Sequence, residues 1–350
     1  MSNTEVYTVR IEPAGIEMEV EENETVLDAA FRQGIALMHG CKEGQCGSCK
    51  AVLVEGDAYD DIELLKFSTF ALPESEREND HILLCRTQVF NDVSIELLNY
   101  DEDLLARSIP VSDYAGHIVN IEQLTHDICK LDIELEKPLK FWAGQYVDIT
   151  IPDRKITRAY SMASTPAQSD KVEFIIKKYA DGVFSSLLDG ELGAGDAVMI
   201  KGPYGTCFRR EDQAGPMILV GGGSGMSPLW SILHDQLNSG DSRQILFFYG
   251  ARTLGDLFYL EQLEAISEKH KNFSFIPALS EADENDHWQG ETGFIHEVVA
   301  RHLMELEGAT DMDAYTCGPP PMIDAVLPVF QMNDIEPERI YFDKFTPSTQ

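Results

Sequence analysis

The chain has 350 residues, 43% of them hydrophobic, which is enough for two or three domains that each bury a core. This excludes a peptide-sized or disordered protein. The 60 acidic and 27 basic residues give a formal net charge of −33, which repels nucleic acid phosphates and anionic lipid headgroups. We therefore expect neither nucleic acid nor a membrane surface as a partner.

The N-terminal sequence, MSNTEVYTVRIEP, has neither the basic region nor the apolar region of a signal peptide. No apolar run approaches the ~18 residues of a membrane span. Seven cysteines are too sparse and too unevenly spaced for the disulfide framework of a secreted protein. We therefore expect a cytoplasmic protein.

Residues 1–100 are expected to form a small α+β domain. Apolar residues alternate over 6–11 and 16–20 as in two strands, and ETVLDAAFRQG reads as a short helix that ends at Gly34. This domain holds 20 acidic and 7 basic side chains, a net charge of −13. The acidic stretch 101–113 contains few strong apolar repeats, and we interpret it as a linker.

The remainder of the chain shows two further patterns. Residues 114–210 are rich in predicted strands separated by turns, namely HIVNIEQLTHDICKLDIEL, QYVDITI, KVEFIIKKY and AVMIKGP, which indicates a small barrel. Residues 211–350 repeat a rhythm of strand, glycine loop and helix, which predicts an α/β domain with a parallel sheet. The sequence therefore predicts a multidomain protein.

Four cysteines are candidate metal ligands. Cys41, Cys46 and Cys49 form a C-x4-C-x2-C run in CKEGQCGSC, and Cys85 follows in ILLCRT. This spacing is that of a plant-type 2Fe–2S cluster, and the intervening glycines let backbone N–H groups approach sulfur. A structural zinc site or unrelated buried thiols are the alternatives, but the unequal spacings are unlike paired zinc knuckles.

The other three cysteines have no ligand spacing. Cys129 and Cys207 are expected to be small buried residues. Cys317 and Gly318 lie in TCGPP, which follows a predicted strand and so lies at the carboxyl edge of the sheet, where ligands of α/β proteins collect. Cys317 is therefore the isolated cysteine to which we assign a function.

A flavin site is predicted in the barrel. Arg158, Tyr160 and Ser161 occur as RAYS at the end of a strand, and Gly182 and Ser185 occur in GVFS, which is expected to open a helix. A flavin dinucleotide needs a cation and helix amides for its pyrophosphate, and an aromatic face and a hydroxyl near its ring. A strand-end salt bridge with a surface tyrosine would also explain RAYS alone, but its order among the other motifs favours flavin.

A nucleotide loop is predicted in VGGGSGMSP, where Gly222, Gly223 and Gly225 separate an apolar strand from a helix. A pyrophosphate meets a helix N-terminus at such a loop. The spacing departs from G-x-G-x-x-G because Met226 takes the last glycine's place, and no acid follows the second strand, which disfavours a Rossmann dehydrogenase. A tight turn without a ligand is the alternative.

These motifs together resemble a known family over essentially the whole chain. CKEGQCGSCK with ILLCRT resembles the plant-type ferredoxin, whereas RAYS, GVFS, GGGSGMSP and CGPPPM resemble ferredoxin–NAD(P)H reductases. Their fusion is similar to reductase components of bacterial multicomponent oxygenases. KFSTFALPESERENDHILLCRT and YFDKFTPS most resemble reductases of soluble di-iron monooxygenases of the methane or propane monooxygenase type.

The resemblance implies a fold and site roles. It implies an α+β ferredoxin-like (β-grasp) domain over 1–100, an antiparallel β-barrel that binds FAD over 114–210 and an NAD-binding α/β domain over 211–350. In the family, the residues matching Arg158 and Tyr160 hold flavin phosphate and ring. The serine matching Ser161 approaches the reactive flavin nitrogen, and the cysteine matching Cys317 lies by the nicotinamide.

Two further residues are candidates on the same basis. NADPH-using relatives tend to carry arginine where this chain has Glu281, and an acid there repels a 2′-phosphate and accepts hydrogen bonds from ribose, which favours NADH. The alternative is that Glu281 only belongs to the solvated loop EADEND. Phe345 is expected near the flavin face that the nicotinamide occupies, with a place in the core as the alternative.

The cofactor order predicts an NADH-dependent flavin and iron–sulfur oxidoreductase. NADH delivers two electrons as a hydride, a 2Fe–2S cluster accepts one at a time, and FAD converts between them. We expect electrons to pass to the hydroxylase of a soluble di-iron alkane or alkene monooxygenase. A reductase of a Rieske-type aromatic dioxygenase shares every motif, and a 2Fe–2S redox sensor is an alternative of another class.

Overall fold

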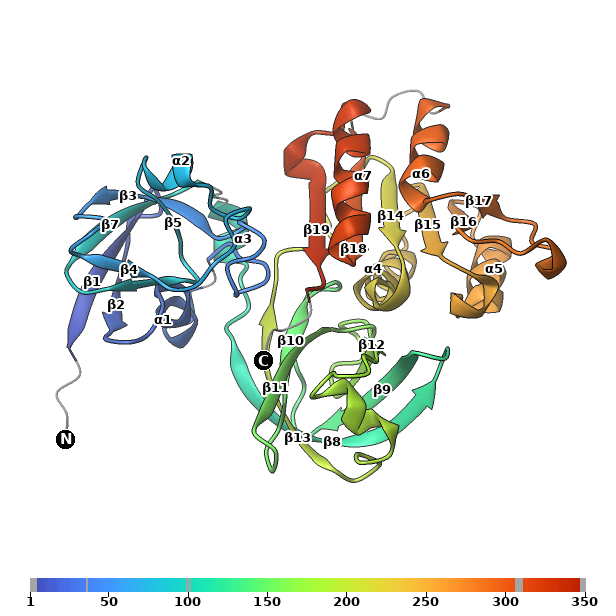
Figure 1. The fold of residues 1–350 in the computed structure, drawn as a ribbon, viewed down its shortest axis with the longest axis horizontal. Coiled ribbons are helices and arrows are strands. Elements are labelled where there is room, and N and C mark those ends of the chain that lie inside the picture. The colour runs from blue at the N-terminus through green and yellow to red at the C-terminus, as the bar shows by residue number, and fades with distance from the viewer. Residues whose placement is uncertain (1–4, 36, 99, 101, 306–310, 347–350) are drawn as a thin grey trace. The chain divides into compact units, whose positions relative to one another are not determined.

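The computed structural model describes residues 5–35, 37–98, 100, 102–305 and 311–346. The chain divides into two compact units (Figure 1). The front unit comprises Met1–Ser112 and Gly202–Thr206, and the rear unit comprises Asp113–Lys201 and Cys207–Gln350. In the described part of the chain, no helix is long and apolar enough to cross a membrane.

The front unit is built on a five-stranded mixed sheet with the order β2-β1-β7-β3-β5. β1 pairs antiparallel with β2 but parallel with β7, the last strand of the unit, which is the arrangement of a β-grasp fold. β4 and β6 form a separate antiparallel pair. The strands are β1 (Val6–Glu12), β2 (Ile16–Glu21), β3 (Lys50–Glu55), β4 (Ile62–Leu64), β5 (His81–Leu83), β6 (Thr87–Val89) and β7 (Val93–Leu97).

The predicted helix of the front unit is confirmed as α1 (Val26–Arg32). Thr25 caps its N-terminus, because the Thr25 hydroxyl accepts a hydrogen bond from the Asp28 amide. Gly34, at φ +74°, takes the left-handed conformation that ends helices. Two short helices, α2 (Glu74–Arg77) and α3 (Glu102–Ala106), complete the unit, and α3 lies in the stretch interpreted as a linker.

The first half of the rear unit is a six-stranded sheet with the order β11-β10-β13-β8-β9-β12. Its core consists of alternate residues such as Leu131 and Ile133 of β9 and Val172 and Phe174 of β12, all buried. The strands are β8 (Ser112–Gln123), β9 (Ile128–Leu135), β10 (Tyr146–Ile151), β11 (Ile156–Ser161), β12 (Lys171–Lys177) and β13 (Ala197–Tyr204).

The second half is a parallel sheet with the order β17-β16-β15-β14-β18-β19, flanked by helices on both faces (Figure 1). The strands are β14 (Met217–Gly221), β15 (Ile245–Ala251), β16 (Phe273–Leu279), β17 (Glu291–Thr292), β18 (Asp313–Gly318) and β19 (Ile340–Lys344). The helices are α4 (Met226–Asn238), α5 (Leu260–Lys269), α6 (Ile295–Met304) and α7 (Pro320–Met332). The predicted fold class is therefore confirmed.

The two halves of the rear unit share a hydrophobic core. Ile128 and Ile175 of the barrel belong to the same buried cluster as Leu229 and Ile232 of α4. Helix α4 is almost completely buried along its first two turns, because it packs on the parallel sheet and also against the barrel. The contact between the barrel and the parallel-sheet half is thus part of the folded core.

Candidate cluster, flavin and nucleotide sites

The four predicted cluster cysteines gather in the front unit as two pairs. The Sγ atom of Cys46 accepts a hydrogen bond from the Cys41 amide at 3.4 Å, and the Sγ atoms of Cys49 and Cys85 are 3.2 Å apart. No three His, Cys, Asp or Glu side chains of the described residues form a site for a single ion. Two thiol pairs suit a cluster of two irons.

Backbone amides approach the sulfur atoms, as the glycines of the loop predict. The amides of Glu43 and Gln45 donate to Cys41 Sγ at 3.4 and 3.3 Å. A Cβ atom at Gly40 would lie 2.9 Å from Cys46 Sγ, so no side chain fits there. Such N–H···S bonds stabilise negative charge on sulfur, and the loop therefore fits a 2Fe–2S cluster.

In each pair, the hydrogen bond lowers the pKa of one thiol. The hydrogen bond with Cys41 lowers the pKa of Cys46 to about 5. The hydrogen bond with Cys85 likewise lowers the pKa of Cys49. The same two hydrogen bonds raise the pKa of Cys41 and of Cys85, the other thiol of each pair. Metal ligands must be thiolates, so binding of a cluster would release the protons that these pairs hold.

His39 supports the cluster loop and was not predicted. Its side chain is buried; Nδ1 lies 2.7 Å from the Leu37 carbonyl, and Nε2 accepts a hydrogen bond from the Gly205 amide at 3.0 Å. Burial lowers the pKa of His39 to about 4, so the ring is neutral and Nε2 can accept. No pattern marks this histidine except its place two residues before Cys41.

The flavin motif lies at the end of β11, which pairs antiparallel with β10. Arg158 and Tyr160 are two residues apart and so share one face of the strand, whereas Ser161 faces the other side and is buried. The Tyr160 ring contacts that of Phe184 at a centroid distance of 5.0 Å. Burial raises the pKa of Tyr160, which therefore keeps its hydroxyl proton at neutral pH.

The GVFS motif forms a tight turn followed by a short 3-10 helix, Ser185–Asp189, where a helix was expected. Gly190, at φ +114°, ends it after five residues. The Ser185 hydroxyl accepts a hydrogen bond from the Tyr179 amide at 3.1 Å. A Cβ atom at Gly182 would lie 2.2 Å from this hydroxyl oxygen. Gly182 and Ser185 thus shape this turn.

The predicted nucleotide loop joins β14 to α4 and is packed too closely for side chains. A Cβ atom at Gly225 would lie 2.0 Å from the Cys317 carbonyl, and one at Gly222 would lie 2.5 Å from the Gly250 carbonyl. Gly223 has φ +57°, a conformation that glycine adopts easily. The three glycines therefore bring the loop against the carboxyl ends of β15 and β18, at the N-terminus of α4.

Cys317 is fully buried at the carboxyl end of β18, and its Sγ atom lies 3.7 Å from that of Cys207. Burial raises the pKa of Cys317 well above its usual value, and the neighbouring thiol raises it further. Cys317 is therefore a neutral thiol, which excludes a nucleophilic role at neutral pH. Cys207 is buried as expected, but its pairing with Cys317 was not predicted.

Glu281 and Phe345 also lie at this edge of the sheet. Glu281 is exposed after β16, and its amide donates to the Arg252 carbonyl at 2.8 Å. Phe345 follows β19, is half-buried, and its amide donates to the Gly318 carbonyl at 2.9 Å. The parallel sheet thus collects Glu281, Phe345, Gly318 and the glycine loop at the carboxyl ends of its strands.

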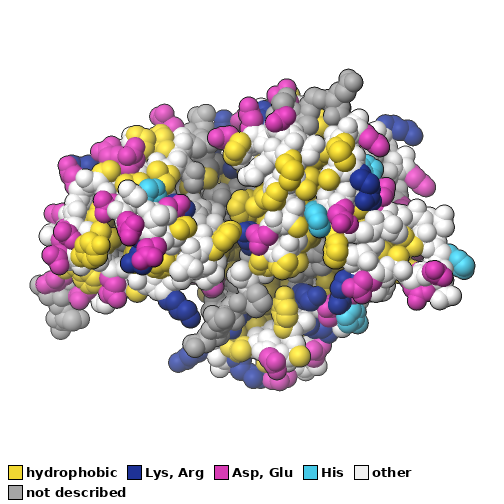
Figure 2. Space-filling model, turned by 45° about the horizontal axis from the view of Figure 1, so that its top comes forward, with side chains coloured by type: hydrophobic (Ala, Val, Ile, Leu, Met, Phe, Trp, Pro, Cys, Tyr) yellow, Lys and Arg dark blue, Asp and Glu magenta, His cyan; other side chains and the backbone are white. Residues whose placement is uncertain are grey.

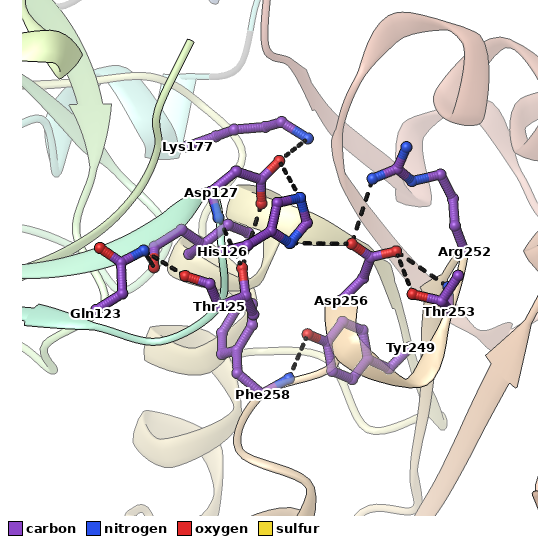
Figure 3. Close-up of polar contacts among 11 residues, drawn as sticks. Gln123, Thr125, His126, Asp127, Lys177, Tyr249, Arg252, Thr253, Asp256 and Phe258 are labelled. Atoms are coloured by element: carbon purple, nitrogen blue, oxygen red, sulfur yellow. Dashed lines mark hydrogen bonds and ion pairs between the residues drawn. The ribbon is translucent and has the colours of Figure 1, made fainter. Parts of the chain in front are cut away.

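A polar contact links the barrel to the nucleotide domain next to Arg252. Figure 3 shows His126, in the turn between β8 and β9, pointing toward Asp256, with 3.7 Å between His126 Nδ1 and Asp256 Oδ1. Asp256 also accepts hydrogen bonds from Thr253 and from Arg252 at 3.3 Å. Sequence reasoning missed the contact between His126 and Asp256, because these two residues are 130 positions apart in the chain.

Three family models match this chain in the order of its domains. They are a 2Fe-2S iron-sulfur cluster binding domain over residues 9–90, an oxidoreductase FAD-binding domain over 115–208 and an oxidoreductase NAD-binding domain over 219–327. Together with the fold and the sites, they define a flavin-dependent iron–sulfur oxidoreductase that takes electrons from NADH.

Relatives that match along nearly the whole chain identify the family more closely. The chain is 42% identical to the reductase component of propane 2-monooxygenase from Mycolicibacterium goodii, over 97% of both chains. It is 38% identical to the reductase component of phenol 2-monooxygenase from Pseudomonas sp. strain CF600, over 97% of this chain and 94% of the relative. The chain belongs to this family of monooxygenase reductase components.

A solved structure has the same architecture. The cytochrome P450 reductase of Amycolatopsis superposes with a TM-score of 0.84 at 28% identity, over 97% of this chain and 99% of that one. The similarity covers all three domains, so the predicted cofactors, a 2Fe–2S cluster, FAD and NADH, are confirmed at the level of the domains that bind them.

Proposed function

We propose that the chain carries electrons from NADH to the hydroxylase component of a soluble di-iron monooxygenase that oxidises an alkane or alkene. The observation that supports this most directly is that two thiol pairs in the front unit, Cys41 with Cys46 and Cys49 with Cys85, occur in the same chain as two other predicted sites. These are β11, which carries the flavin motif, and the nucleotide loop. Bound FAD would accept a hydride and release electrons singly.

β11, which carries the RAYS motif, and the GVFS turn form the proposed FAD site. Arg158 supplies a positive charge for the pyrophosphate, Tyr160 an aromatic face for the ring, and Ser161 a polar group near the reactive nitrogen. Gly182 and Ser185 hold the turn in which backbone amides face the phosphates. The proposed domain boundaries are 1–100, 114–210 and 211–350, with the linker at 101–113.

The carboxyl edge of the parallel sheet forms the proposed NADH site. Gly222, Gly223 and Gly225 admit the pyrophosphate at the N-terminus of α4, where the helix dipole favours negative charge. Gly318 and the neutral thiol of Cys317 pack beside the nicotinamide, and Phe345 covers the flavin face. Glu281, exposed beside the Arg252 backbone, accepts hydrogen bonds from ribose and disfavours a 2′-phosphate.

The front unit is the proposed docking surface for the hydroxylase. Figure 2 shows acidic side chains spread over the visible face of this unit. Residues 1–100 have a net charge of −13, which steers association toward a basic surface on the acceptor. We propose no nucleic acid and no membrane surface as a partner, and we propose that the protein acts in the cytoplasm.

Reconstitution tests the proposal. The purified chain is combined with NADH and separately with a di-iron alkane hydroxylase, a di-iron phenol hydroxylase and a dioxygenase component, and coupled product formation is measured. We expect NADH-driven reduction of ferricyanide in every case and hydroxylation with the alkane enzyme. Turnover only with the dioxygenase would change the partner, whereas no steady-state reduction of ferricyanide would indicate a redox sensor.

A further inference from the structure

The flavin barrel has a seam between its two outer strands. β11 and β12 are at opposite ends of the sheet order and do not form a ladder. Beyond the end of β11, a bridge between Met162 and Phe174 and a hydrogen bond from the Ala163 amide to the Glu173 carbonyl join the two edges. At the level of Ser161, the seam therefore needs another partner for its backbone groups.

A side chain of the nucleotide domain provides this partner. The hydroxyl of Ser227, the second residue of α4, donates to the Ser161 carbonyl at 2.6 Å and accepts from the Ile175 amide at 3.1 Å. Ser227 is 1% exposed. A single buried hydroxyl thus satisfies one backbone group on each side of the seam.

One turn later, a second serine makes a related contact. The Ser231 hydroxyl donates to the Ser164 carbonyl at 2.6 Å, and Ser231 is fully buried. The Ser164 hydroxyl in turn accepts from the Glu173 amide at 3.2 Å. Ser231 therefore lies on the same helix as Ser227, is likewise buried and donates a hydrogen bond of the same length. Its acceptor, Ser164, lies three residues beyond Ser161 in the chain.

The position of Ser227 connects two sites. Gly225, the last glycine of the nucleotide loop, lies two residues before it, and Ser161, the last residue of β11, is its hydrogen-bond acceptor. A change in the position of α4 therefore moves the Ser161 backbone as well. The rate of hydride transfer falls steeply as the distance between donor and acceptor grows, so the contact between Ser227 and Ser161 affects this rate.

We infer that Ser227 is a positioning residue for hydride transfer, which fixes the backbone of Ser161 relative to the loop that receives NADH. It acts through Ser161 and has no direct contact with either cofactor in this role. The inference rests on the proposed function, because it takes Ser161 as the serine beside the reactive nitrogen of the flavin. Alanine at 227 would leave the Ser161 carbonyl and the Ile175 amide without this partner.

The test compares Ser227→Ala with Ser231→Ala, each loaded with FAD. Stopped-flow measurement of flavin reduction over a range of NADH concentrations separates the reduction rate constant from the NADH dissociation constant. We expect Ser227→Ala to lower the rate constant about tenfold with little change in NADH affinity. Ser231→Ala should change it less than about threefold, and Ser227→Thr, which keeps the hydroxyl, should restore most of the rate.

Two further readouts do not depend on turnover. Hydrogen exchange of the Ile175 amide in the protein without FAD should accelerate in Ser227→Ala and not in Ser231→Ala, because this amide donates to the Ser227 hydroxyl and not to that of Ser231. If Ser227→Ala does not fold, Ser227→Cys, with its weaker hydrogen-bonding thiol, carries the same comparison. The FAD dissociation constant of each variant shows whether the flavin site is intact.

The outcomes separate this inference from the proposed function. Equal rate constants in Ser227→Ala and Ser231→Ala, or unchanged exchange at Ile175, would overturn the positioning role. Ser161→Ala is measured in parallel. If it leaves flavin reduction and FAD affinity unchanged, the assignment of Ser161 fails. If it slows reduction while Ser227→Ala does not, only the inference fails.

Discussion

The thiols of Cys207 and Cys317 face each other across 3.7 Å, although 110 residues separate them in the chain. Cys207 follows the last barrel strand, and Cys317 precedes the final residue of β18. Both side chains are buried, and Cys317 is held as a neutral thiol. The contact therefore connects the barrel to the sheet edge at which we place the nicotinamide.

Cys317→Ala should lower the rate constant of flavin reduction by NADH about tenfold and change the NADH dissociation constant much less, because a positioning contact acts mainly in the transition state. Stopped-flow absorbance at a series of NADH concentrations measures both quantities. Cys207→Ala is the matched control, since it removes the other sulfur of the pair but lies outside the sheet edge. Equal effects of the two variants would reduce Cys317 to a packing residue.

Cys85→Ser should abolish the cluster and spare flavin reduction. The protein should contain about two irons and two labile sulfides per chain, and the variant should contain neither. Because the FAD and NADH sites lie in the rear unit, NADH should still bleach the flavin. Iron and sulfide analysis with stopped-flow absorbance measures both, and Cys129→Ser, which alters a buried thiol outside the cluster, should behave as wild type.

Glu281→Arg should raise activity with NADPH relative to NADH. An arginine there would bind the 2′-phosphate that the carboxylate repels, and we expect the ratio of kcat/KM values for the two nucleotides to move by at least about tenfold. The ferricyanide assay with each nucleotide measures it. Glu284→Arg adds the same charge in the same loop, and a similar shift there would show that net charge alone decides the preference.

Coupled hydroxylation should fall with added salt. Charges on the front unit are screened over about 8 Å at physiological ionic strength, so electrostatic docking weakens while internal electron transfer does not. Product formation and NADH–ferricyanide activity are measured side by side from low to high salt. A flat salt profile of coupled hydroxylation would contradict acidic-face docking and leave the cofactor assignments intact.

The rear unit should lose stability as the pH falls through the ordinary pKa of histidine, near 6.5. Burial lowers the pKa of His234, on α4, so the unfolded state takes up a proton that the folded state does not. The loss begins below about pH 6.5 and continues toward the lowered folded pKa. Urea unfolding at pH 7.5 and 5.5 should show a smaller loss for His234→Gln than for wild type, and His270→Gln is the comparison variant.

The sequence predicts those parts of the site that depend on local spacing. Cys41, Cys46 and Cys49 lie within nine residues, so the constraint of one cluster is visible in the chain itself. The glycine loop is predictable for a similar reason, because Gly222 and Gly225 have to pass close to neighbouring backbone. The alternation of strands and helices likewise gives the fold of each domain.

Contacts between distant segments could not be predicted in this way. Ser227 and Ser161 are 66 residues apart, and a serine two residues into a helix carries no signal of a partner in another domain. His39 depends on Gly205, 166 residues away. The expected helix at Ser185 is only a short 3-10 segment, because Gly190 takes a left-handed conformation that ends it.

The barrel seam has a consequence for engineering. A chimera cut at residue 210 and joined to another nucleotide domain would keep every residue of the flavin motif, yet it would lose the Ser227 hydroxyl that closes the barrel between Ser161 and Ile175. It would also lose the α4 half of the core that contains Ile128 and Ile175. Nucleotide specificity in such reductases should therefore be changed by single substitutions at the sheet edge, with α4 retained. The barrel and this helix share a core and hydrogen bonds, so they have to be transferred together.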